Sequence, residues 1–360
     1  MRYVLLTLVL LGGLFGFLLL TNPHQPAAYL PPPAPELVGV LAPNNLLQQA
    51  EILGAGEAKA PEDVDQDAEG WVYGGLEDGR IIRLNNDQVE TFADTGGRPL
   101  GLHFDMAGDL VVADAMQGLL LIEPDGKITQ LVTEVDGVAL GFTDDVDIAA
   151  DGSIYFSDAS TKWAFPDYKS DLLETRPYGR LIRYEPASGE VETLLKDLYF
   201  ANGVAVSEDE DYVLVNESWT YRVLRYWLTG PRAGQMDAFS DNLPGIPDGI
   251  SRGRHPVTGE PLYWVALATP RNNLVDRIHP YPWLKKLIMS LPAALQPKPV
   301  HYGLVLALNA EGEIIKSLHD PEGETLYQVT SVQQVGDNLY FGSLQNDRIG
   351  RLSVRALFTQ

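Results

Sequence analysis

Short apolar runs separated by tight polar turns recur along most of this chain. In residues 200–206 (Phe-Ala-Asn-Gly-Val-Ala-Val), apolar and small residues lead into an acidic turn at 207–211 and a second run of β-branched and aromatic residues at 212–215. This pattern predicts two antiparallel strands joined by a short turn. Similar phrases begin near residues 61, 99, 143, 200, 247 and 329.

Alignment of the six copies places one residue of each at an equivalent position, directly before the apolar part of the first strand. These residues are Glu62, Leu100, Asp144, Asn202, Asp248 and Thr330. A unit of about 40 to 50 residues that contains several strands is typical of a β-propeller blade. We therefore predict an all-β fold, a six-bladed β-propeller, over residues 46–360.

The first strand of each blade borders the central channel of a propeller, so the six equivalent positions should form a ring. Four of them carry side-chain oxygens: Glu62, Asp144, Asn202 and Asp248. Three carboxylates this close are unfavourable unless they are protonated or matched by a cation. Oxygen ligands from four blades suit the adaptable shell of Ca²⁺ better than the strict octahedron of Mg²⁺. The pattern favours one central Ca²⁺; the alternative is that these residues cap turns at strand starts.

The copies differ in the connections between their strands. Residues 46–53 should form a strand that pairs with the last blade and so removes an exposed sheet edge. The loop 159–178 in blade three carries Trp163, Phe165 and Tyr168, which either line a pocket mouth or pack on the propeller face. Blade five is interrupted after Trp264, and residues 281–295 have helical spacing of apolar positions. We expect this helical insertion to be a lid over the channel; a contact with a membrane surface, for which Lys285 and Lys286 would be suitable, is the alternative.

The N-terminal residues suggest that the protein is attached to a membrane. Residues 4–20 form an apolar run of 17 residues after Arg2, close to the lower limit of about 17 to 25 for a membrane span. We predict an uncleaved transmembrane helix over residues 1–21, with Arg2 on the cytoplasmic side and the body exported, to the periplasmic side of the inner membrane in a Gram-negative cell. A cleaved signal peptide is the alternative. The Pro-rich residues 22–45 should then form a stiff spacer.

Net charge and the absence of cysteine exclude some classes of partner and of site. The chain has 49 acidic and 26 basic residues and a net charge of −23, so we expect no nucleic-acid partner, because binding to the phosphate backbone depends on a basic surface. It has no cysteine, which excludes disulfides, thiolate metal sites and cysteine nucleophiles.

Among the scattered histidines, His103 lies three residues after Leu100, near the inner start of blade two. It is a candidate general base, although a lone histidine on a strand is more often packed or hydrogen-bonded. Residues 249–253 (Gly-Ile-Ser-Arg-Gly) match the nucleophile elbow of α/β-hydrolases, but that motif needs a following helix and residues 254–259 read as a loop.

Several phrases together resemble the strictosidine synthase-like family, within the superfamily of SMP-30/gluconolactonases and paraoxonases. They lie at residues 97–101, 155–160, 179–181, 200–205, 247–250 and 317–321. Within the family the chain looks most similar to the adipocyte plasma membrane-associated proteins, which likewise carry an N-terminal anchor. The resemblance implies a six-bladed propeller with a central Ca²⁺ and, in many members, hydrolysis of lactones or aryl esters.

The resemblance also assigns roles to residues. The family's metal-binding Glu, Asn and Asp correspond to Glu62, Asn202 and Asp248, and a further Asn of many members corresponds to Asp144. The glutamate of the plant synthases falls at Thr330, so the condensation of amine and aldehyde is not expected. The paraoxonase histidine falls at Leu100, so a mechanism based on two histidines is not expected either.

Together these observations predict a membrane-anchored, Ca²⁺-dependent hydrolase acting on a small-molecule ester or lactone. In this hypothesis the ion polarises the ester carbonyl, and Asp248, or a water that it orients, is the general base. Asp114 and Asp158, at the end of the following strand in blades two and three, are weaker candidates. The alternative is a non-catalytic propeller that binds a ligand or a protein and uses the ion structurally.

Overall fold

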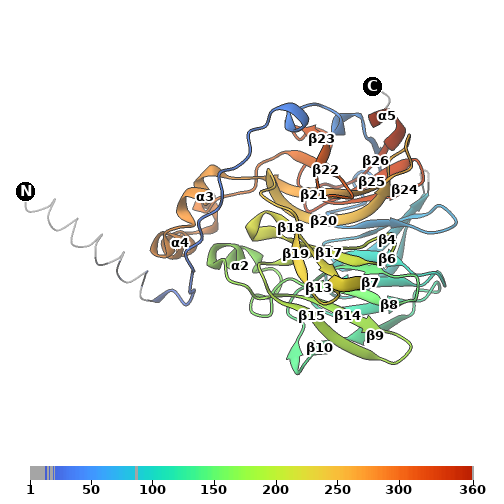
Figure 1. Cartoon of the computed structure of the whole chain (residues 1–360), viewed down its shortest axis with the longest axis horizontal. Helices are drawn as coiled ribbons and strands as arrows, with labels where there is room; N and C mark the ends of the chain where they lie inside the picture. Colours follow the sequence, from blue (N-terminus) through green and yellow to red (C-terminus); the bar gives the residue numbers. More distant parts are fainter. Residues whose placement is uncertain (1–12, 14–15, 17–18, 20, 86–87, 359–360) are drawn as a thin grey trace, which may run out of the picture.

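The computed structural model describes residues 13, 16, 19, 21–85 and 88–358 (Figure 1). Its strands form six four-stranded antiparallel sheets, the blades of a propeller, as the repeats predict. Blades one to three consist of β2 (Val64–Gln66), β3 (Val72–Gly75), β4 (Arg80–Asn85) and β5 (Gln88–Asp94); β6 (Pro99–Phe104), β7 (Leu110–Asp114), β8 (Gly118–Ile122) and β9 (Ile128–Val132); and β12 (Thr143–Ile148), β13 (Ile154–Asp158), β14 (Gly179–Glu185) and β15 (Glu190–Leu198). A small hairpin, β10 (Glu134–Val135) and β11 (Val138–Ala139), precedes blade three.

The later blades follow the same plan. They consist of β16 (Ala201–Val206), β17 (Tyr212–Glu217), β18 (Arg222–Trp227) and β19 (Met236–Ser240); β20 (Gly245–Arg254), β21 (Pro261–Pro270), β22 (Gly303–Asn309) and β23 (Ile314–Asp320); and β24 (Val329–Val335), β25 (Asn338–Ser343), β26 (Ile349–Ser353) and β1 (Glu51–Leu53). Short helical turns lie at Gly39–Leu41, Leu47–Gln49, Ser218–Thr220 and Gly230–Arg232, and α5 (Val354–Phe358) follows the last blade. Each blade therefore has the first strand of its repeat at the inner edge, and blade six takes its outermost strand, β1, from the N-terminal part of the chain.

The innermost strands β2, β6, β12, β16, β20 and β24 contact one another in sequence around the hub. Aspartates of blades one and three bind the backbone of the next blade: Asp63 Oδ2 accepts from the Leu102 N–H (2.7 Å) and Asp145 Oδ2 from the Val204 N–H (2.8 Å). Glycine allows blades four and five to approach closely as well, since a Cβ on Gly203 would lie 2.4 Å from the Asp248 carbonyl oxygen. Aspartate side chains that bind the neighbouring backbone, together with a glycine that leaves room for it, thus hold the inner strands close around the channel.

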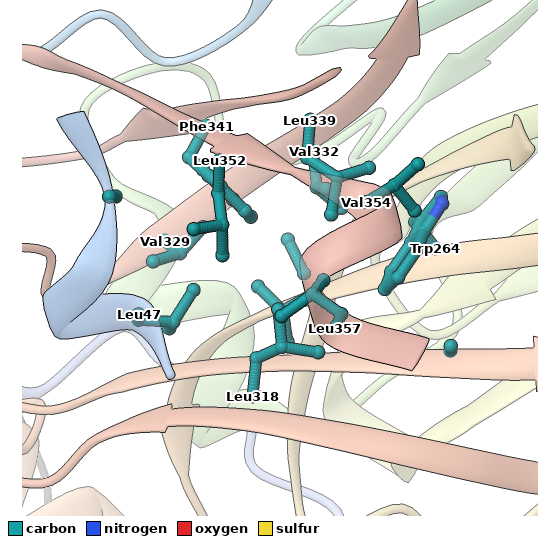
Figure 2. Close-up of a cluster of buried hydrophobic side chains, with 14 of the residues drawn as sticks. Leu47, Trp264, Leu318, Val329, Val332, Leu339, Phe341, Leu352, Val354 and Leu357 are labelled. Atoms are coloured by element: carbon teal, nitrogen blue, oxygen red, sulfur yellow. The ribbon is translucent and has the colours of Figure 1, made fainter. Parts of the chain in front are cut away.

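Both ends of the chain contribute to blade six. β1 pairs with β26, with Ile52 opposite Gly350, which confirms the predicted closure of the ring. The predicted strand over 46–53 is wrong in its first half, where residues 47–49 form a helical turn. Its Leu47 and α5's Leu357 point into one buried cluster between blades five and six (Figure 2). Burial of Leu47 explains the turn, because a continuous strand would direct the alternate side chains away from this cluster.

Three helices, α2, α3 and α4, gather at one side of the propeller (Figure 1). α2 (Tyr168–Glu174) lies between β13 and β14, and α3 (Asn273–Ile278), α4 (Pro282–Met289) and a helical turn at Ala293–Leu295 lie between β21 and β22. α4 contacts both α2 and α3. The helix expected over 281–295 is therefore shorter, with Leu291 beyond its end. We call α2 together with residues 271–302 the helical cap.

The N-terminal segment lies along this cap. The apolar run predicted to be a membrane anchor falls mostly outside the described residues, and no helix within the described part is long and apolar enough to cross a membrane. Residues 22–45, expected to be a spacer, instead bind the body: the Ala27 N–H donates to the Glu174 carbonyl (2.8 Å), the Tyr29 N–H to the His279 carbonyl (3.0 Å), and Arg271 to the Pro32 carbonyl (2.7 Å). Proline lacks an N–H, so these bonds use the carbonyl groups of the proline stretch and the N–H groups before it.

Candidate metal and substrate site

All six equivalent positions of the repeat meet at the hub. Glu62, Leu100, Asp144, Asn202, Asp248 and Thr330 line one narrow space on the propeller axis. Glu62, Asp144 and Asn202 are buried, and Asp248 is partly buried. Glu62 lies just before its inner strand, and the other five lie within the first four residues of theirs. At these five positions a shift of register interrupts the pairing of β6, β12, β16, β20 and β24 with the next strand.

The polar atoms of the ring are only partly satisfied. Glu62 Oε2 pairs with the Arg98 guanidinium at 3.2 Å, and the Asn202 side chain donates to the Asp248 carboxylate. Thr330 Oγ1 donates to the Glu62 carbonyl oxygen at 2.7 Å. Asp144 Oδ2 is buried without a hydrogen-bond partner in the described part of the chain.

Burial raises the pKa of all three ring carboxyls. For Asp144 the shift is large, and the charges of Asp248 and Glu62 add to it. For Asp248 burial and the Glu62 charge outweigh the hydrogen bond from Asn202. Burial also raises the pKa of Glu62, although the Arg98 charge opposes it. Each carboxyl would ionise more readily if a cation lay among them.

The donor set fits a hard divalent cation. Three ionised carboxylates and one guanidinium leave a net charge of −2 at the hub, and the unpartnered Asp144 Oδ2 is available as a ligand. Among residues 21–85 and 88–358, however, no group of three or more Asp, Glu, His or Cys side chains is already arranged as a metal centre. The residues that could hold the ion are Glu62, Asp144, Asn202 and Asp248.

An apolar cavity of about 140 Å³ lies directly above the ring and shares its four polar residues as a floor. Its walls are aromatic: Phe142, Phe165, Tyr168, Phe200 and Trp219. The Phe200 ring lies 4.4 Å from the Trp219 ring and 5.3 Å from the Phe142 ring, between ring centroids. The cavity therefore suits an apolar molecule with one polar group directed at the ring.

The aromatic loop of blade three divides between two roles. Phe165 and Tyr168 line the cavity, whereas Trp163 stacks on His24 of the N-terminal segment, with ring centroids 4.8 Å apart. The helical cap closes part of the mouth through Lys169, Asn272 and Lys298. The lid that the sequence favours stays a prediction, and this lining by the cap is compatible with it.

The structure does not bring His103 together with the other candidate residues. It lines a separate polar chamber toward the opposite end of the inner strands. Its Nδ1 is 3.3 Å from Asp65 Oδ2 and its Nε2 is 3.4 Å from Asp147 Oδ1. Burial alone would lower the pKa of His103, but the hydrogen bond with Asp65 and the charges of Asp65 and Asp147 raise it to about 9. An imidazolium is no general base, so this geometry favours a bridge between blades one, two and three.

The weaker candidates Asp114 and Asp158 are buried and hold turns. Asp114 Oδ1 accepts from the N–H groups of Arg98 (3.0 Å) and Met116 (2.9 Å). Asp158 pairs with Arg180 at 2.6 Å. Neither lines the aromatic cavity.

Arg98 is the contributor to the site that sequence reasoning missed. It is 1% exposed and binds Glu62 together with the Ala60 carbonyl (3.2 Å), so it orients the metal-binding glutamate. The available signal was its place one residue before the inner strand of blade two, in a chain poor in basic residues.

Comparisons with known proteins show the family and the fold of the chain. Family models match residues 39–84 (strictosidine synthase-like, N-terminal) and residues 144–231 (strictosidine synthase). Adipocyte plasma membrane-associated protein of Homo sapiens is 35% identical over 99% of this chain and 89% of that protein. Strictosidine synthase-like 6 of Arabidopsis thaliana is 36% identical over 86% of this chain and 82% of that protein.

Solved structures share the fold at low sequence identity. A gluconolactonase from Xanthomonas campestris has a TM-score of 0.61 at 18% identity, covering 92% of this chain and 97% of that one. Regucalcin from Agrobacterium tumefaciens, a calcium-binding protein, has a TM-score of 0.58 at 15% identity, covering 84% and 92%. The sequence relatives together with the matching family models show that the chain belongs to the strictosidine synthase-like family.

Proposed function

We propose that this protein is a membrane-anchored hydrolase that uses a divalent cation, Ca²⁺, to cleave a lactone or an aryl ester. One observation carries the proposal: three carboxyl groups and an amide, buried or partly buried, form the floor of an aromatic cavity, and with Arg98 counted they would have a net charge of −2 when all three are ionised. The relationship to gluconolactonase-type propellers in fold supports the reaction class. The apolar N-terminal run and the names of the membrane-associated relatives support the anchor.

The chain's own residues would divide the work as follows. Glu62, Asp144, Asn202 and Asp248 would hold the ion, with Arg98 keeping Glu62 in place. When bound, the ion supplies Lewis-acid polarisation of the carbonyl and stabilises the oxyanion. The aromatic walls hold the acyl or aryl part and exclude bulk water from the ring.

Asp248 would move the proton. Its carboxylate takes a proton from water as the water oxygen bonds to the carbonyl carbon, and the proton then passes to the leaving oxygen as the C–O bond breaks. The products are a carboxylic acid and an alcohol or phenol, so one water is consumed for each bond cleaved. The other two ring positions hold Thr330 and Leu100, which have no carboxylate or imidazole. We therefore propose neither the condensation that the resemblance implies for plant synthases nor a mechanism based on two histidines.

A non-catalytic propeller with a structural ion is the second candidate. The same two positions favour it, because Leu100 and Thr330 place no titratable group on that part of the ring. It predicts ligand binding in the aromatic cavity without turnover.

The test uses the full chain in detergent, assayed against γ-lactones and phenyl acetate with Ca²⁺ or with EDTA. We expect turnover that EDTA abolishes, and Asp248→Asn should reduce kcat by about 10² to 10⁴, the usual contribution of a general base. Asp151→Asn, at an exposed turn, is the matched control and should retain full activity. An absence of turnover on the whole panel, combined with Ca²⁺-dependent melting, would contradict the hydrolase and support the binding protein.

A further inference from the structure

The point where the N-terminal apolar run reaches the body is fixed on the helical cap. Asn22 Nδ2 donates to Ser290 Oγ (2.7 Å) and to the Lys286 carbonyl (3.2 Å) at the end of α4. Two residues later, His24 binds Ser170 Oγ of α2 at 3.0 Å. If residues 4–20 insert in a membrane, only Thr21 separates them from this attachment, so the cap must lie close to that membrane.

The cap also exposes large apolar side chains. Leu274, Tyr281, Trp283 and Leu295 are each at least 52% exposed. Single exposed apolar residues are normal, but four within one insertion are more than a scattered distribution would place there, and they are available for contact with an apolar partner. Tyrosine and tryptophan are the side chains enriched at membrane–water interfaces.

The insertion that forms most of the cap has a net positive charge, whereas the chain as a whole has a net negative charge. Residues 271–302 contain five basic residues and one acidic residue, Asp276, in a protein of net charge −23. The two acidic residues of α2, Asp171 and Glu174, are buried. Asp276 pairs with Arg271 at 2.9 Å. Arg277 and Lys298 are exposed and Lys286 is partly exposed, and Lys169 of α2 adds a further exposed cation. Basic residues near an anionic membrane surface are attracted to it.

The cap residues also form part of the cavity mouth. Lys169, Asn272 and Lys298 line the aromatic cavity as well as belonging to the cap. A cap on the membrane would therefore place the mouth of the cavity beside the acyl chains and headgroups. This arrangement suits a lipophilic substrate that partitions into lipid.

We propose that the helical cap rests on the surface of the anionic bilayer that holds the N-terminal anchor, and that the aromatic cavity takes lipophilic esters or lactones from that bilayer. The inference rests on the proposed membrane anchor. It adds a second, interfacial contact and a direction of substrate entry.

The absence of cysteine allows a direct test in the full chain. Trp283→Cys and Leu295→Cys each place one thiol on the cap for an environment-sensitive fluorophore. Met106→Cys and Val257→Cys are the matched controls, because they are exposed on turns that follow β6 and β20, at the end of these strands away from the cavity. In vesicles of phosphatidylcholine and phosphatidylglycerol, we expect headgroup spin-labelled lipid to quench the two cap labels at least threefold more than the two controls.

The outcomes separate the anchor from the cap. Vesicle flotation tests the anchor first; a chain that does not float overturns both the anchor and this inference. A chain that floats but whose cap labels are quenched no more than the controls overturns the cap contact alone. Cap labels that are shielded in native membranes but not in pure lipid vesicles would indicate a protein partner and would also overturn the lipid contact.

A charge reversal tests the role of the cations. Lys286→Glu combined with Lys298→Glu should lower the quenching of the Leu295→Cys label in anionic vesicles and leave it unchanged in pure phosphatidylcholine. Lys127→Glu, on the turn between β8 and β9, should have no effect in either. Equal quenching in all these variants would contradict the electrostatic part of the proposal.

Discussion

Asp144→Asn should have opposite effects on stability with and without the metal. Asp144 is 4% exposed and its Oδ2 has no hydrogen-bond partner in the part of the chain that the structure describes. Burial and the charges of Asp248 and Glu62 raise its pKa. Without a cation, the asparagine removes a destabilising charge from nearly the same shape. With a cation, it removes a ligand.

An unsatisfied buried polar group costs about 1–3 kcal/mol, and a charged one costs more. The asparagine amide would also lack a partner, so the gain comes only from removing the charge. At a pH where Asp144 is ionised, the metal-free variant should be more stable than the metal-free wild type by about 1.4 kcal/mol for each unit by which burial raises the pKa. Ca²⁺ at 100 times its Kd stabilises the wild type by about 2.7 kcal/mol. If the substitution weakens binding tenfold, the same Ca²⁺ concentration stabilises the variant by only about 1.4 kcal/mol.

The pH dependence has a defined sign. Because the folded-state pKa of Asp144 is raised, the native protein holds this proton more tightly than the unfolded chain. Its contribution to stability is present at low pH and is lost as pH rises through the folded-state pKa. In EDTA the wild type should therefore lose more stability than Asp144→Asn between pH 5 and pH 8.

Denaturant unfolding of the full chain in detergent, in EDTA and in Ca²⁺, measures these differences. Asp151→Asn, at an exposed turn, is the control and should follow the wild type in every condition. The reasoning is refuted if Asp144→Asn is less stable than the wild type in EDTA at pH 8, or if Ca²⁺ stabilises both proteins equally.

Three further predictions concern the surroundings of the ring. His103→Gln should lower the free energy of unfolding by about 2–3 kcal/mol at pH 7, because a pKa of about 9 in the folded state stabilises the protonated form. In urea unfolding, this difference from the wild type should disappear above pH 9. An equal loss at pH 6.5 and pH 10 would contradict the ionic bridge between Asp65, His103 and Asp147. Gly203→Ala should lower the free energy of unfolding by about 1–3 kcal/mol and weaken Ca²⁺ binding in calorimetry, since its Cβ would lie 2.4 Å from the Asp248 carbonyl oxygen. If the variant keeps the stability and the Ca²⁺ affinity of the wild type, the inner strands of blades four and five can move apart and the reasoning is wrong. Phe142→Leu should raise the KM for phenyl acetate about tenfold with kcat unchanged, as aromatic contacts contribute about 0.5–1.5 kcal/mol; an unchanged KM would place the aryl group elsewhere.

The ring was predictable because it depends on a repeat. Glu62, Asp144, Asn202 and Asp248 occupy one position in a unit that recurs, and strands that start at the hub bring equivalent positions together whatever lies between them. The N-terminal closure followed from the need to cover a sheet edge, although Leu47 turned out to pack in a helical turn.

Contacts that depend on loops were not predictable. Asn22 meets Ser290 across 268 residues of sequence, and no periodicity links the two. The pairing of Arg98 with Glu62 depends on the angle between two blades, and the separation of His103 from the ring depends on how far the inner strand extends along the channel. Such distances are set by packing between blades rather than by the pattern within one.

Isothermal titration calorimetry of the full chain with Ca²⁺ tests the central claim most directly, namely that side chains from four blades hold one divalent ion at the hub. We expect the wild type to bind Ca²⁺, and we expect Glu62→Gln, Asn202→Ala and Asp248→Asn each to weaken this binding at least tenfold. Asp151→Asn should bind Ca²⁺ as the wild type does. Absence of Ca²⁺ binding by the wild type, or wild-type affinity in all three ring variants, would contradict the claim.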